Sequence, residues 1–262
     1  MNILRRELRA GLKPFLLWMI GMFVLCFAGI IKFESYTESG SMTELLASFP
    51  RVVLAVMGAV GVDIGTLSGY TALLFYYVLI CAVIYAVHLG AGAVTRESVD
   101  KTYEFVFTKP CSRSRVLGMK LTSAYLYLLL FCVFNGLFSM LAVTYLKTSE
   151  TMTAEIWLCV LAVFLIGTLF VALSAFFASV AERPEKGTLY GNLAFLYAFI
   201  LGVVYNMLEK PGLLKLIAPF NYFSSANLAA QRIEPFYIAI TLVLTAALLF
   251  GAFAKFKRKD LK

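Results

Sequence analysis

Long uncharged stretches dominate the pattern of apolar and polar positions along this chain of 262 residues. A bilayer core of about 30 Å requires about 20 predominantly apolar residues in a helix, so stretches of this length without Asp, Glu, Lys or Arg predict membrane spans. Six such stretches predict an all-α polytopic membrane protein with a single transmembrane domain over residues 1–262. The predicted spans, built on these stretches, are about 14–31, 66–94, 118–146, 156–181, 187–208 and 235–254.

The composition agrees with this class, and the charge pattern adds an orientation. The chain is 61% hydrophobic and 15% charged, whereas soluble domains average about 45–50% apolar and about 25% charged. With six spans, 17 of the 23 lysines and arginines fall on the side of both termini, and 6 fall on the other side. The excess predicts that both termini are cytoplasmic. Basic flanks also suit anionic lipid headgroups, so membrane lipid is an expected partner and nucleic acid is not.

The first residues predict a separate short helix before the first span. Leucine recurs every fourth residue at Leu4, Leu8 and Leu12, and basic residues lie beside this stripe. The pattern is typical of an amphipathic helix in the cytoplasmic interface, joined to the first span at Pro14. The alternative is a simple basic flank of the span.

The chain lacks the groups that intrinsic chemistry or ion coupling would need. No phosphate-binding loop of the G-x-x-x-x-G-K-[ST] type occurs, and the cores of the six spans contain no charged residue, although ion-coupled carriers usually place one there. His88 is the single histidine, and we expect it to be a packed or hydrogen-bonded core residue. We therefore expect no catalytic, cofactor-binding or metal-binding residue in this chain, and any energy for transport enters from outside the spans.

The connection between the second and third spans predicts an amphipathic cytoplasmic helix over about residues 96–108. Its apolar stripe has spacings of i, i+4, i+7 and i+8 at Val99, Tyr103, Val106 and Phe107. Such a stripe could face a partner protein, or it could rest on lipid headgroups or on the protein's own spans.

The run Glu97–Lys120 resembles the cytoplasmic connection of ABC-2-type transporter permeases, in which a glutamate precedes the pattern T-x-E-x-L-x-x-x-P-x-S-R and a lysine opens the next span. Six positions match: Thr102, Glu104, Pro110, Ser112, Arg113 and Lys120. The chain departs from many relatives at Lys101, where they carry glycine, and at Phe105 and Phe107, where they carry aliphatic residues. Two weaker resemblances are the F-P-R-V-V-L-A-V-M-G run at Phe49–Gly58 and the L-I-A-P-F-N-Y-F run at Leu216–Phe223, which resembles a re-entrant hairpin between spans 5 and 6.

The resemblance implies a permease subunit of a bacterial ATP-binding-cassette exporter in the plasma membrane. It implies a separate ATPase subunit that carries ATP and Mg, and a second permease copy or homologue that completes a homo- or heterodimer. It also identifies the predicted helix as a coupling helix that contacts the ATPase. The implied coupling residues are Glu97, Asp100, Thr102, Tyr103, Glu104, Val106, Phe107, Pro110 and Arg113.

Two further sets of residues are candidates for function. Arg183, Glu185 and Lys186 could form a second ATPase contact, or they could be a solvated charged turn. Pro219, Phe220 and Tyr222 of the hairpin are candidates for an extracellular gate.

Two other functional classes share the same hydropathy pattern. A channel or uncoupled carrier would not need the cytoplasmic helix, and a membrane assembly or scaffold protein would keep the helix without a substrate pathway. The substrate stays open among a membrane-active peptide, an antibiotic, a lipid and an ion.

Overall fold

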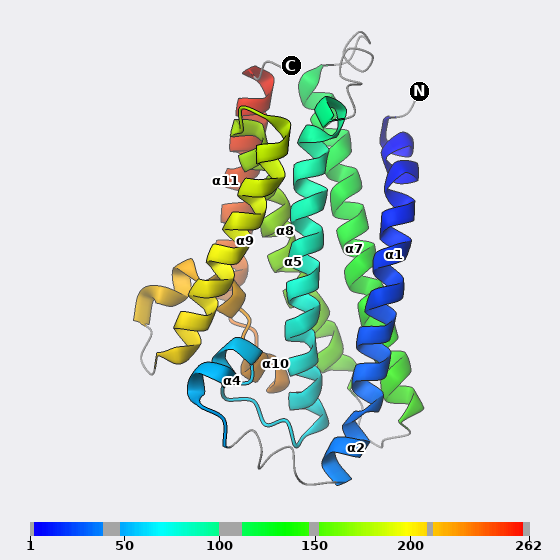
Figure 1. Ribbon diagram of the computed structural model, residues 1–262, viewed down its shortest axis with the longest axis vertical. Coiled ribbons are helices and arrows are strands. Elements are labelled where there is room, and N and C mark those ends of the chain that lie inside the picture. The colour runs from blue at the N-terminus through cyan, green and yellow to red at the C-terminus, as the bar shows by residue number, and fades with distance from the viewer. Residues whose placement is uncertain (1–2, 39–47, 100–111, 147–151, 209–211, 259–262) are drawn as a thin grey trace.

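The computed structural model describes residues 3–38, 48–99, 112–146, 152–208 and 212–258, and the described part contains helices and no strand. Six helices are long and apolar enough to span a membrane, which confirms the six predicted spans. They are α1 (Ile3–Ile31), α5 (Leu67–Val99), α7 (Arg113–Tyr145), α8 (Thr153–Val180), α9 (Pro184–Met207) and α11 (Pro235–Arg258). They run side by side as one bundle (Figure 1).

Helices α5 and α8 form the centre of the bundle. These two helices share the most extensive helix–helix interface. Helix α1 packs mainly on α7, and α11 packs mainly on α8. Helix α9 contacts both central helices. Val78 and Val87 of α5 and Phe170 of α8 are almost completely buried in the core between these helices. The central pair therefore positions every other span.

Small residues bring α5, α8 and α9 into close contact. A Cβ atom on Gly90 would lie 2.3 Å from the carbonyl oxygen of Val171, so α5 touches the α8 backbone at this point. The Ser174 hydroxyl donates a hydrogen bond to the Val87 carbonyl oxygen at 2.7 Å, and Gly191 of α9 lies against both of these residues. Close approach of this kind, with hydroxyl groups bonding across helices, is how membrane helices associate without a hydrophobic driving force.

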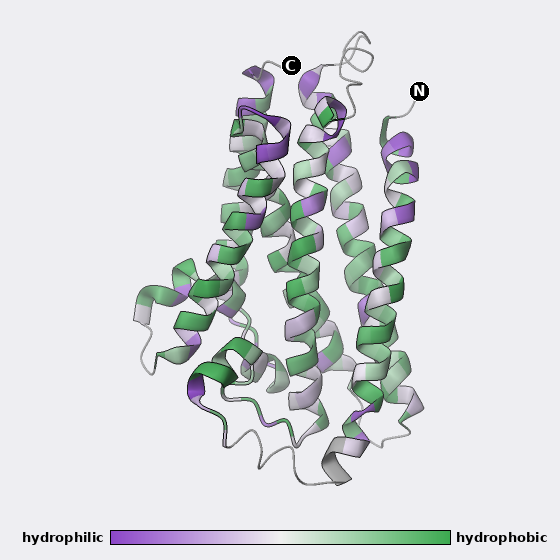
Figure 2. Ribbon diagram, viewed as in Figure 1, coloured by the Kyte–Doolittle hydropathy of each residue, from purple (hydrophilic) through white to green (hydrophobic). Residues whose placement is uncertain are grey.

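The bundle has one end that carries most of the positive charge, and we call it the basic end. Helices α1, α7 and α9 begin there, and α5, α8 and α11 end there, at the top of Figure 1. Hydrophilic residues gather at this end, whereas the middle of each long helix is hydrophobic (Figure 2). This pattern matches a bundle whose central part lies in hydrocarbon.

The N-terminal residues continue the first span instead of forming a separate helix. Helix α1 runs from Ile3 to Ile31 with Pro14 inside it, so the predicted interfacial helix with a joint at Pro14 is wrong. The face that packs on the bundle carries Glu7, Gly11 and Phe15, and Leu12 of the predicted stripe is exposed. A Cβ atom on Gly11 would lie 2.5 Å from the Tyr127 ring, so close contact with α7 holds residues 3–13 in line with the span.

The opposite end holds short elements between the spans. They are α2 (Phe33–Glu38), α4 (Arg51–Met57), the 3₁₀ helices η1 (Gly212–Ile217) and η2 (Pro219–Asn221), and α10 (Ser225–Ala229). The side chain of Arg51 donates to the carbonyl oxygens of Asn206 and Leu208, where α9 ends. Helix α4 is thereby fixed to the end of α9, and its Val52, Val53 and Val56 side chains are exposed.

Element η2 inserts an aromatic side chain between α8 and α9. The Phe220 ring centroid lies 5.9 Å from that of Phe170 and 6.0 Å from those of Phe195 and Phe199. Phe170 and Phe195 lie near the midpoints of α8 and α9 in sequence. The connection between the last two spans therefore reaches into the bundle instead of lying over its end.

The contact at Gly90 gives a test of the packing. We predict that Gly90→Ala lowers the unfolding temperature of the detergent-solubilised protein, because the added methyl group meets backbone that cannot move aside. Gly21→Ala in α1 is the matched control, since nothing lies within 4 Å of its added Cβ, and alanine favours helix by about 1 kcal/mol over glycine. Equal unfolding temperatures for the two variants would contradict the close α5–α8 contact.

Candidate functional site

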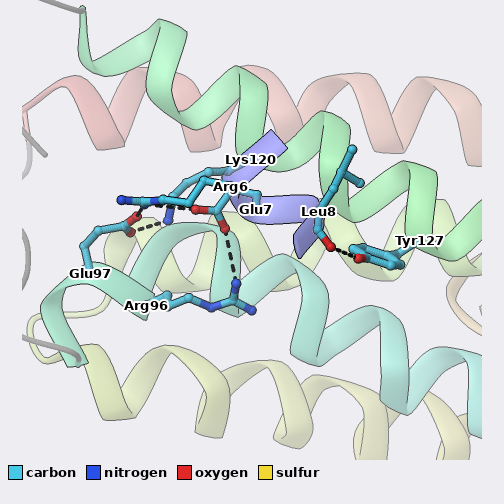
Figure 3. Close-up of polar contacts among 7 residues, drawn as sticks. All are labelled: Arg6, Glu7, Leu8, Arg96, Glu97, Lys120 and Tyr127. Carbon is cyan, nitrogen blue, oxygen red and sulfur yellow. Dashed lines mark hydrogen bonds and ion pairs between the residues drawn. The ribbon is translucent and has the colours of Figure 1, made fainter. Parts of the chain in front are cut away.

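Five charged side chains from three helices meet at the basic end, and we call this group the ion-pair network. Its members are Arg6 and Glu7 of α1, Arg96 and Glu97 of α5, and Lys120 of α7 (Figure 3). Arg6 Nη2 lies 3.0 Å from both Glu7 Oε1 and Glu97 Oε1, and Arg96 Nη1 lies 3.2 Å from Glu7 Oε2. Lys120 Nζ pairs with Glu97 Oε2. Each carboxylate therefore binds two cations, and every pair but one joins two different helices.

Both carboxylates and the lysine of the network are buried. Glu7 is 6% exposed, Glu97 is 7% exposed and Lys120 is 3% exposed. Removing buried charges from water is costly, and loss of one partner leaves an uncompensated charge that destabilises a protein by about 3–5 kcal/mol. The three helices are thus held together by charges that none of them could bury alone.

The surrounding contacts fix the helices that supply the network. The Tyr127 hydroxyl of α7 donates to the Leu8 carbonyl oxygen of α1, next to Glu7 (Figure 3). At the start of α7, the Ser112 side chain accepts a hydrogen bond from the Arg115 backbone N–H and caps the helix. Lys120 lies seven residues after the first residue of α7, which is about 10 Å at 1.5 Å per residue. The network therefore lies below the helix ends, near the edge of the apolar part of the bundle.

The two helices that flank the predicted coupling segment, α5 and α7, both contribute to this network. Of its implied residues, Asp100, Thr102, Tyr103, Glu104, Val106, Phe107 and Pro110 lie outside the described residues, so the coupling helix stays a prediction. Glu97 is two residues from the end of α5, and α5 continues through Arg96–Val99 without a break. Arg113 is exposed at the start of α7. Glu97 lies in α5 before residues 100–111, and Lys120 lies in α7 after them. The Glu97–Lys120 salt bridge therefore joins the two helices that flank this segment.

The other predicted residues occupy two separate places. Arg183 is the N-cap residue of α9 at the basic end, and Glu185 and Lys186 lie in the first turn of this helix. Arg183 and Glu185 are exposed, and Lys186 is half-buried. Phe220 and Tyr222 are buried toward the opposite end, in the connection that begins with Pro219. The candidate gate is therefore remote from the ion-pair network, and the two belong to different parts of any mechanism.

Tyr222 fixes the shape of the candidate gate. Its hydroxyl donates a hydrogen bond to the Leu216 carbonyl oxygen of η1, and its ring stacks on that of Tyr237 at the start of α11, with centroids 5.1 Å apart. Burial raises the pKa of the Tyr222 phenol above its ordinary value, and the neighbouring Tyr237 adds to the effect. The hydroxyl therefore stays protonated and remains a donor.

His88 is exposed, so its prediction as a packed core residue is wrong. It belongs to a stripe along α5 with Tyr77, Cys81 and Ile84, and all four side chains are at least partly open to the surface of the single chain. The spacing of 4, 3 and 4 residues places them on one helical face, which is not covered by α8. Among the described residues, no hydrogen-bond partner of the imidazole is found.

Sequence reasoning did not find most of the ion-pair network. The family resemblance points to Glu97 and Lys120, but the apolar periodicity of the first residues does not predict that Glu7 is buried. The available signal was that Glu7 is the one acidic residue before the first span. A lone carboxylate among arginines, on the same helical face as Gly11 and Phe15, is the pattern of a buried ion pair.

Comparison with known proteins identifies a family. The family described as "ABC-2 family transporter protein" matches residues 1–261, which is essentially the whole chain. Among curated proteins, no significant match is found.

A double-mutant cycle tests the central salt bridge. We predict that Lys120→Met lowers the unfolding temperature strongly, because Glu97 loses its buried partner, at a cost of about 3–5 kcal/mol. Glu97→Gln is expected to destabilise in the same direction. The double variant with both changes should lose much less stability than the sum of the two single losses. Strictly additive losses, measured by thermal unfolding in detergent, would show that the two side chains do not interact.

Proposed function

The chain belongs to the ABC-2 family of transporter proteins, and on this premise we propose that it is the transmembrane permease subunit of an ATP-binding-cassette exporter. It moves a substrate across or out of the membrane with energy from ATP that a separate ATPase subunit binds with Mg and hydrolyses. The observation that carries this proposal is the ion-pair network, which links both ends of the predicted coupling segment to three spans.

The network supports a mechanical role for the segment 100–111. Glu97 precedes the segment and Lys120 follows it, and the two are paired. Arg6 and Glu7 connect this pair to α1. When the ATPase displaces the segment, α1, α5 and α7 shift together, because separating them would strand buried charges. Rigid-body movement between two packed arrangements is the usual form of such a switch.

The basic end faces the cytoplasm in this proposal. It carries the excess of lysine and arginine residues that cytoplasmic sides have, and both ends of the coupling segment lie there. The exposed turn with Arg183 and Glu185 is at the same end, in reach of a second contact with the same ATPase. Both termini are then cytoplasmic, and the short elements of the opposite end are extracellular.

The open stripe of α5 is where a second permease copy packs. A polar side chain such as His88 is costly against lipid, and polar residues in spans usually face protein or a water-filled cavity. In the single chain, His88 is exposed, and Tyr77 and Cys81 on the same face of this central helix are half-buried. A second copy, identical or homologous, would cover this face and enclose the substrate pathway next to it.

The connection before α11 is a re-entrant hairpin that closes the outer end of the pathway. Phe220 lies between α8 and α9 at the level of Phe170 and Phe195, and Pro219 begins the 3₁₀ turn that carries it. The Asn221 amide donates to Asn206 Oδ1 of α9 at 2.6 Å. A relative shift of α8 and α9 would release the Phe220 ring, and this makes the hairpin a gate. The spans lined by apolar and aromatic residues suit an amphipathic cargo.

The ATPase contact can be tested by co-purification. We predict that an ATP-binding-cassette ATPase encoded beside this protein co-purifies with it, and that Tyr103→Ala or Glu104→Arg abolishes this binding by removing the apolar stripe or reversing its neighbouring charge. Glu34→Arg, an exposed position at the opposite end, is the matched charge-reversal control. If both coupling variants fold and still bind the ATPase as wild type does, the coupling helix is refuted.

The second-copy contact can be tested with a natural cysteine. Among the described cysteines, Cys81 is half-exposed and Cys26, Cys132 and Cys159 are buried. We predict that, in a Cys111→Ser background in membranes, a short bifunctional maleimide joins two chains through Cys81. The dimer band should vanish in Cys81→Ser. A band that persists in Cys81→Ser, or no band at any reagent length, would place the contact on another face.

A further inference from the structure

A groove at the basic end lies between the start of α7 and the last turns of α11. It has a volume of about 610 Å³. Ser114 of α7 forms one wall, and the other lining residues are Phe250, Phe253, Ala254, Lys255, Lys257 and Arg258 of α11. The groove is separate from the ion-pair network and from the candidate gate.

The inner part of the groove is apolar and open. Phe250 is 78% exposed, the largest exposure among the aromatic side chains of the described spans. It lies eight residues before the end of α11, which is about 12 Å along the helix. The same helix exposes Leu242 and Val243 further from the basic end, so this surface of α11 is the one that hydrocarbon chains contact. Phe253 closes the inner part against Gly118 of α7.

The outer part of the groove is cationic. Lys255, Lys257 and Arg258 are all exposed, and among the described residues none of them pairs with an acidic side chain. The two buried carboxylates of the basic end, Glu7 and Glu97, are already occupied by the ion-pair network. Three positive charges therefore lie next to an open aromatic surface at the basic end of α11.

We propose that this groove binds one anionic phospholipid, with its phosphate among Lys255, Lys257 and Arg258 and an acyl chain along Phe250 and Phe253. Basic pockets between spans on the cytoplasmic side suit anionic headgroups, and the amphipathic stems of lysine and arginine place their charges at the interface. A free phosphate would use only the cationic rim and would leave Phe250 without a contact. A phospholipid matches both parts of the groove, because its phosphate binds the cationic rim and its acyl chain contacts the apolar surface.

A lipid at this position would connect the last span to the start of α7. Ser114 belongs to the first turn of α7, directly after the segment 100–111. The bound lipid would therefore stabilise the spacing of α7 and α11 at the place where the coupling segment ends. This binding site is independent of the proposed ATPase partner, so it can be tested on the permease alone.

Native mass spectrometry of the purified full chain tests the cationic rim, with phosphatidylglycerol as the probe. We expect the K255Q/K257Q/R258Q variant to retain at least tenfold less of the lipid than wild type. The R5Q/R9Q/K13Q variant removes three exposed charges from α1 at the same end and should retain the wild-type amount. Equal loss in both variants would show diffuse attraction to the surface and would overturn the site.

A second pair of variants tests the apolar part and guards against misfolding. Phe250→Ser should reduce phosphatidylglycerol retention severalfold, whereas Phe236→Ser, which changes an exposed phenylalanine at the other end of α11, should not. Both variants should keep the wild-type unfolding temperature within a few degrees. Unchanged retention in Phe250→Ser, or displacement of the lipid by inorganic phosphate alone, would mean that only the headgroup is recognised and would contradict a phospholipid site.

Discussion

The need of two buried carboxylates for cationic partners is the constraint on which the rest of this structure depends. Glu7 and Glu97 lie in different spans and are almost completely removed from water. Their cationic partners are Arg6, Arg96 and Lys120, which come from all three helices α1, α5 and α7. The pairing sets how α1 lies against the bundle, and it joins the two helices that flank the segment for which energy coupling is proposed.

The remaining spans are arranged by a different kind of contact. Gly90 and Gly191 allow α5, α8 and α9 to approach until backbone and hydroxyl groups touch. The central helices are therefore closely packed in the middle of the bundle and joined by charges at one end. Helix α5 takes part in both kinds of contact. A displacement of the basic end would therefore move α5 as a rigid helix and reach the far end, where Phe220 lies between α8 and α9.

The six spans could be predicted from sequence because a bilayer imposes one simple requirement, about 20 apolar residues in a row. Which face of the first helix packs on the bundle could not be predicted, because Arg96, the partner of Glu7 on another helix, lies 89 residues away in sequence, and local periodicity says nothing about it. The exposure of His88 could not be predicted for a related reason, because only the assembled bundle determines which face of α5 stays uncovered.

The role of the network in transmission can be measured without knowing the substrate. Spin labels at position 12 of α1, introduced as Leu12→Cys in a background without other reactive cysteines, would report the distance between the two α1 helices of the proposed dimer in complex with the proposed ATPase. ATP binding should change this distance in the otherwise unaltered protein. In the Glu97→Gln, Lys120→Met background, the ATPase should still bind and the change should disappear. An unchanged ATP-dependent shift in that background would contradict the transmission of movement through the buried charges.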